Sequence, residues 1–117
     1  MDQKDREKIE RIISSRKETH EFLHSRKSKV YESFLELERN TFKDKKLSKM
    51  HKEFIALGIS VIINCESCME WHIKEALNSG SNKDQIIEAL EVAIEMGGGP
   101  ATVSSRFALK VLEYYQK

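Results

Sequence analysis

The sequence contains few residues of the types that interrupt or cross-link a polypeptide chain. Its 117 residues include one proline, five glycines and two cysteines. A membrane-spanning helix requires roughly 20 apolar residues in a row, and the longest apolar run here reaches only about ten. Residues 1–13 are polar and mixed in charge, without the apolar centre of a signal peptide. We therefore expect a cytoplasmic protein with no membrane partner.

An excess of charge of either sign is also absent. The 20 basic and 19 acidic side chains leave a formal net charge of +1, which gives no electrostatic reason to expect nucleic acid as a partner. Charged residues make up 33% of the chain and hydrophobic residues 39%, a balance typical of a folded soluble protein. The length is suited to one domain with a real core.

Apolar side chains recur at helical spacing from Val30 onward, and no window alternates apolar and polar residues long enough to form a strand. The pattern therefore predicts an all-α fold. Helices are expected to begin near Val30, Ser48, Cys65, Ser81 and Pro100. The expected helix stops are a turn at residues 40–45, Ile63, Gly80 and the glycines at 97–99.

Local signals set these boundaries. Ser48 and Asn64 are candidate N-caps, and residues 81–84 resemble a capping box. Gly80 can take the left-handed conformation that closes a helix, and Pro100 suits a first helical turn.

Residues 1–29 are mostly charged and carry few apolar anchors. Ile9, Ile12 and Ile13 fit one side of a short helix, and the segment around Phe22 belongs to a second helix or to a connection. We expect residues 1–29 to form a helical extension that lies over the core or on a neighbouring subunit. The main domain is expected to span residues 30–117.

Both cysteines lie in one stretch, residues 53–72. Cys65 and Cys68 are three residues apart, so a disulfide between them would close a tiny loop and add little stability by chain entropy. The spacing indicates redox chemistry or metal binding instead. At about 100° per residue, Cys65, Cys68 and His72 share a helix face about 60° wide, directed toward the apolar interior. The charged side chains expected to point away from that face are Glu66, Glu70 and Lys74.

The position of Glu53 depends on the turn between two helices. If residues 48–63 and 65–78 form an antiparallel hairpin, Glu53 and His72 lie within roughly one helical turn of each other, within reach of their side chains. A single continuous helix would place Glu53 ~18 Å from Cys65. The hairpin is what makes a relay from Glu53 through His72 to Cys68 feasible.

These residue types suit thiol chemistry. A helix N-terminus stabilises a thiolate, and His72 can accept the proton of Cys68 or return one to a leaving thiolate. Glu53 can orient the imidazole of His72, and Cys65 can resolve whatever forms on Cys68 by closing a disulfide.

The pattern Glu53-x11-Cys65-x2-Cys68-x3-His72, with its flanks at 52–58, 72–76 and 97–101, resembles the AhpD-like alkylhydroperoxidase group of the carboxymuconolactone decarboxylase superfamily. The resemblance covers roughly residues 30–115. It implies an AhpD-like helical bundle that assembles into trimers or hexamers. It also implies an oxidoreductase that reduces peroxides or disulfides and is recycled by a dithiol or thioredoxin-like donor.

The resemblance implies roles for four residues. Cys68 matches the attacking or peroxidatic thiol, Cys65 its disulfide partner, and Glu53 with His72 the proton relay. AhpD-type peroxidases often have a histidine just before the second cysteine, where this sequence has Ser67. Disulfide reduction is therefore better supported than peroxidase activity. No cofactor is expected, because the dithiol itself carries two electrons.

A non-enzymatic alternative uses the same side chains. In this alternative the protein is a metal-binding or assembly module. Cys65, Cys68 and His72 would supply three metal ligands, and one further histidine would supply the fourth. The candidates for that fourth ligand are His20, His24 and His51. The cysteines could also be two small buried residues one turn apart.

Overall fold

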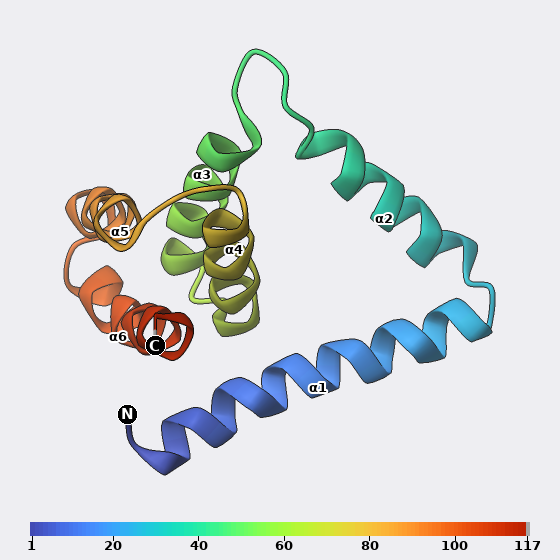
Figure 1. The fold of residues 1–117 in the computed structure, drawn as a ribbon, viewed down its shortest axis with the longest axis horizontal. Helices are drawn as coiled ribbons and strands as arrows, with labels where there is room; N and C mark the ends of the chain where they lie inside the picture. Colours follow the sequence, from blue (N-terminus) through green and yellow to red (C-terminus); the bar gives the residue numbers. More distant parts are fainter. Residues whose placement is uncertain (117) are drawn as a thin grey trace.

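The computed structural model describes residues 1–116, which form six helices and no strand (Figure 1). The helices are α1 (Gln3–Ser25), α2 (Lys29–Thr41), α3 (Lys49–Ile62), α4 (Glu66–Asn78), α5 (Lys83–Gly97) and α6 (Gly99–Tyr115). The predicted all-α fold is confirmed. Among the described residues, no helix is long and apolar enough to cross a membrane.

Helices α3 to α6 form the core, with α3 and α4 side by side as an antiparallel hairpin (Figure 1). Leu57 and Val61 of α3 meet Met69 and Ile73 of α4 in the buried cluster. Each fully buried aliphatic side chain contributes about 1.5–3 kcal/mol relative to an exposed one. The predicted hairpin is therefore fixed by its apolar faces.

The turn between α3 and α4 closes by a paired backbone motif. Asn64 is left-handed, with φ 54°, and its N–H donates to the carbonyl of Val61 while the N–H of Cys65 donates to that of Ser60. This Schellman pattern satisfies the last carbonyls of α3. Asn64 was predicted as the N-cap of α4, but it closes α3, and the N-cap position belongs to Cys65.

The start of α5 differs from its prediction by one residue. The capping box is formed by Asn82 and Gln85, whereas residues 81–84 were predicted. Ser81 cannot begin the capping box, because the N–H of Ser81 donates to the carbonyl of Ala76. This hydrogen bond completes the turn that closes α4 at Gly80. Ser48 caps α3 as predicted, accepting a hydrogen bond from the N–H of His51.

The N-terminal third of the chain forms two helices: α1 packs against α4 and α6, whereas α2 extends away from the α3–α6 core (Figure 1). α1 is one continuous helix, where the sequence suggested a short helix followed by a second or a connection. Only Ile9 of α1 is buried, and α2 buries no residue. The proposed division into residues 1–29 and 30–117 stays a prediction.

Candidate redox site

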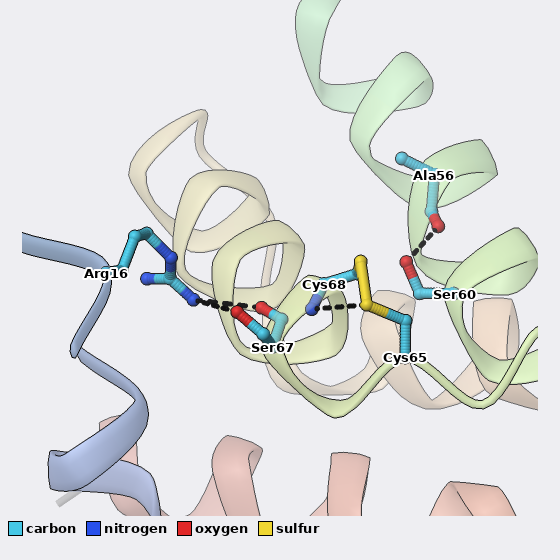
Figure 2. Close-up of a disulfide and its surroundings, with 6 residues drawn as sticks. All are labelled: Arg16, Ala56, Ser60, Cys65, Ser67 and Cys68. Atoms are coloured by element: carbon cyan, nitrogen blue, oxygen red, sulfur yellow. Dashed lines mark hydrogen bonds between the residues drawn. A yellow bond between two sulfur atoms is a disulfide. The ribbon is translucent and has the colours of Figure 1, made fainter. Parts of the chain in front are cut away.

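The two cysteines are joined by a disulfide at the N-terminus of α4 (Figure 2). Cys65 is the N-cap residue, and its Sγ accepts a hydrogen bond of 3.2 Å from the backbone N–H of Cys68. Both side chains are half-buried. The left-handed turn at Asn64 places Cys65 at the N-cap of α4, where the amide dipoles favour a thiolate once the disulfide is reduced.

The α3–α4 hairpin brings Glu53 against His72, as the sequence predicted. Glu53 Oε1 lies 2.7 Å from His72 Nδ1, and Glu53 is only 1% exposed. A carboxylate in this position accepts the Nδ1 hydrogen and leaves Nε2 as the basic nitrogen. The ring of Phe42 lies 5.5 Å from the imidazole, measured between centroids, and covers it on one side.

Cys68 and His72, one helical turn apart on α4, line the same cavity. It has a volume of about 1210 Å³ and lies between α1, α2 and α4. Apolar side chains from α1 and α2, including Ile12 and Phe34, form part of its wall. Cys68 and His72 are therefore both reached from this one cavity.

Lys49, which the sequence analysis did not identify, joins the site from the first turn of α3. Its Nζ lies 3.0 Å from Glu53 Oε2 and 2.9 Å from Glu75 Oε1. Burial lowers the pKa of Lys49, but its hydrogen bonds to Glu75 and Glu53 outweigh that effect, so the pKa is raised overall. The i,i+4 spacing of Lys49 and Glu53 was a sequence signal for this pair.

Glu70 was predicted to point away from the interior, and this prediction is wrong. Its side chain is fully buried, because α1 and α6 pack over that face of α4. Arg16 of α1 forms an ion pair with Oε1 of Glu70, and the hydroxyl of Tyr115 donates to Oε2. Burial, together with the hydrogen bond to Glu70, raises the pKa of Tyr115.

The same arginine holds the turn between the cysteines. Nη2 of Arg16 donates to the backbone oxygen of Ser67 at 2.9 Å and to its Oγ at 3.0 Å (Figure 2). Arg16 and Ser67 are 51 positions apart, so no local pattern could have predicted the contact. α1 is thereby attached directly to the Cys65–Cys68 segment.

The histidines considered as metal ligands have other neighbours. His20 Nδ1 lies 2.7 Å from the Tyr31 hydroxyl, and His24 Nδ1 lies 3.0 Å from Glu32 Oε1. His51 Nδ1 lies 2.9 Å from the hydroxyl of its helix cap. Within residues 1–116, no group of three or more His, Cys, Asp or Glu side chains is arranged to hold a metal ion.

Known proteins share this fold and parts of this sequence. Residues 28–111 match the family model of the carboxymuconolactone decarboxylase family. A family member from Legionella pneumophila has the same fold with a TM-score of 0.88 and 25% identity, over 94% of this chain and 98% of that one. A family member from Thermotoga maritima, described in connection with an antioxidative response, gives a TM-score of 0.79 and 27% identity, over 89% of this chain and 88% of that one.

Two relatives are similar in sequence. Uncharacterized protein 4 in the cox locus of Paracoccus denitrificans is 37% identical over 84 residues, which is 72% of this chain and 76% of that protein. Alkyl hydroperoxide reductase AhpD of Corynebacterium kroppenstedtii is 31% identical over 62 residues, 53% of this chain but only 36% of that protein. With its all-helical fold and Cys-x-x-Cys pair, the chain belongs to the carboxymuconolactone decarboxylase family as an AhpD-like member.

Proposed function

We propose that this protein is an AhpD-like thiol–disulfide oxidoreductase that reduces peroxides or disulfides with the Cys65/Cys68 dithiol. The observation that supports this most strongly is the contact between buried Glu53 and His72, one turn along α4 from Cys68. In the proposed mechanism these two residues are the proton relay and Cys68 is the attacking thiol.

The proposed reaction starts from the reduced protein. His72 Nε2 takes the proton of Cys68, and Glu53 stabilises the imidazolium that forms. With a disulfide substrate, the Cys68 thiolate attacks one sulfur, forms a mixed disulfide and releases the first thiolate. Cys65 then attacks Cys68, closes the intramolecular disulfide and releases the second thiolate. The two protons of the dithiol end on the two leaving thiolates.

A peroxide substrate requires the same two electrons. The thiolate attacks one peroxide oxygen, giving a sulfenic acid on Cys68 and an alcohol, and Cys65 displaces the sulfenic oxygen as water. An external dithiol or thioredoxin-like donor, in a reducing cytoplasmic compartment, restores the dithiol by exchange. Ser67 stands where AhpD-type peroxidases often have a histidine, so we expect disulfide substrates to be reduced faster than peroxides.

We also propose that the protein is a homo-oligomer, a trimer or hexamer. On α2, Val30, Phe34 and Leu37 are 84%, 57% and 62% exposed. An isolated 13-residue helix is marginal in water, and the described chain leaves this apolar face of α2 exposed, so we expect a second subunit to cover it. Light scattering should give the mass of a trimer or hexamer, and Phe34→Glu should lower it. A wild-type monomer would contradict this proposal.

The function is tested with reduced, metal-free protein and two probes, tert-butyl hydroperoxide and a chromogenic aryl disulfide. Cys68→Ser should abolish turnover, and Glu53→Gln or His72→Phe should reduce it by about 10²-fold or more. The matched controls are Glu91→Gln, on the exposed side of α5, and His51→Phe. Wild-type rates in all three site variants would refute the mechanism.

The metal-binding alternative has less support, because the candidate fourth ligands His20, His24 and His51 each have another hydrogen-bond partner. Metal analysis of the protein as purified, with Cys65→Ser as control, separates the two. One equivalent of metal per chain that is lost in Cys65→Ser would favour the alternative.

A further inference from the structure

The buried carboxylate of Glu53 has two partners, and only one of them is in the proposed relay. Oε1 faces His72 at 2.7 Å, and Oε2 faces Lys49 at 3.0 Å. A buried carboxylate stays ionised only if hydrogen bonds and a nearby positive charge compensate for its lost hydration. A neutral His72, which is the form that can accept a proton, supplies a hydrogen bond but no charge. Lys49 supplies the charge.

The ammonium of Lys49 is itself held at a fixed position. Besides Glu53, Nζ contacts Glu75 Oε1 at 2.9 Å and Ser79 Oγ at 3.4 Å. An ammonium has three N–H donors, so these three acceptors account for all of them. The start of α3 is thereby attached to the end of α4, and the direction of the hydrogen bond to Glu53 is fixed.

We propose that Lys49 is a positioning residue of the relay, which keeps Glu53 ionised and oriented as the acceptor for His72 Nδ1–H. The inference rests on the proposed function for its catalytic meaning. The effect of Lys49 on the proton affinity of the Glu53–His72 pair can be measured without turnover. The raised pKa of Lys49 agrees with an ammonium bound to two carboxylates.

The sign of the expected effect follows from charge. Removing a cation beside Glu53 and His72 makes the pair retain its extra proton to higher pH, whichever of the two carries it. His72 can accept the proton of Cys68 only after the pair has released that extra proton. Without Lys49, the acid limb of the pH–rate profile should therefore move to higher pH.

Other charged groups face the same carboxylate. Glu38 and Arg39 of α2 and Lys43 of the following turn line a cavity of about 380 Å³ next to Glu53. Glu75 of α4 lines it as well and is, among residues 1–116, the other carboxylate bound to Lys49. Removing the charge of Glu75 should leave Glu53 as the remaining carboxylate beside Lys49, and the acid limb should stay in place or move to lower pH.

The experiment compares wild type with Lys49→Met, Lys49→Arg and Glu75→Gln as full-length reduced proteins. The first readout is the pH titration of the His72 imidazole by NMR, recorded without substrate. The second is the pH dependence of turnover of the aryl disulfide. We expect Lys49→Met to shift both curves to higher pH. At pH values on the acid limb of the wild-type profile, its rate should be about tenfold or more below that of wild type. Lys49→Arg should restore most of the wild-type behaviour because it keeps the charge.

Three outcomes separate the possibilities. If Lys49→Met leaves both curves in place and only lowers the melting temperature, Lys49 merely attaches α3 to α4, and the proposal is overturned. An upward shift of equal size in Glu75→Gln would also overturn it. If the wild type turns over neither probe, the proposed function fails, while the His72 titration still decides whether Lys49 sets the proton affinity of the pair.

Discussion

The burial of Glu70 makes the stability of the fold depend on Arg16. Glu70 is fully buried, and its charge is compensated by a guanidinium whose side chain is 27% exposed. Breaking a fully buried ion pair by removing one partner costs about 3–5 kcal/mol. Because Arg16 is partly exposed, water can partly solvate the carboxylate left behind, so we expect about 2–3 kcal/mol for Arg16→Met.

A second substitution should recover part of that loss. Glu70→Gln removes the buried charge while its amide oxygen can still accept from Tyr115. In the double variant Arg16→Met/Glu70→Gln no charge is left unpaired. We expect it to be more stable than Arg16→Met alone by about 1–2 kcal/mol, a coupling that additive effects cannot produce.

Urea unfolding at one fixed protein concentration measures these differences, since an oligomer's stability depends on concentration. The matched control is Arg11→Met, an exposed arginine of α1 with no ion pair in the described part of the chain. We expect the control to stay within about 0.5 kcal/mol of wild type. Two results would refute the reasoning: a cost of Arg16→Met equal to the control, or a double variant as unstable as the sum of its single changes.

Two further predictions concern stability. The pKa of Tyr115 is raised from its ordinary 10.0, chiefly by burial, so above that pH the folded state keeps a proton that the unfolded state has lost, and stability falls as pH rises. Urea unfolding across that range should show a steeper fall for wild type than for Tyr115→Phe; equal slopes would contradict this origin. Gly97→Ala should cost about 1–3 kcal/mol, because a Cβ there would lie 2.8 Å from Ala101 Cβ, which is fixed to the backbone and cannot turn away. Gly58→Ala, in a helix interior with nothing within 4 Å of the added Cβ, should by contrast stabilise the protein, and thermal melts that rank the two variants the other way would contradict the packing argument.

The parts of the fold that were predicted correctly depend on short-range patterns. Helical periodicity and the cap at Ser48 located α3, and the polar break at Asn64 located the start of α4 to within one residue. The contact between Glu53 and His72 followed from the same information, because a hairpin of known rise fixes which residues lie opposite.

The failures share a different origin. The burial of Glu70 depends on Arg16, 54 positions earlier, and on Tyr115, 45 positions later, so the periodicity of α4 alone assigns it to solvent. α1 has one buried apolar residue, and its attachment to the core runs through ion pairs and hydrogen bonds. Hydrophobic periodicity cannot detect an attachment made by charges, which is why α1 was predicted in pieces.

The hydrogen bonds from Arg16 to Ser67 have a practical consequence for handling the protein. A truncation that removes α1 removes Arg16, which donates hydrogen bonds to Ser67 between the two cysteines. It also leaves the buried Glu70 carboxylate without its counterion. Such a shortened protein would differ from the full chain in the behaviour of its thiols as well as in stability. The N-terminal helix is thus part of what holds the Cys65–Cys68 segment in place, and shortened versions are not neutral substitutes for the whole chain.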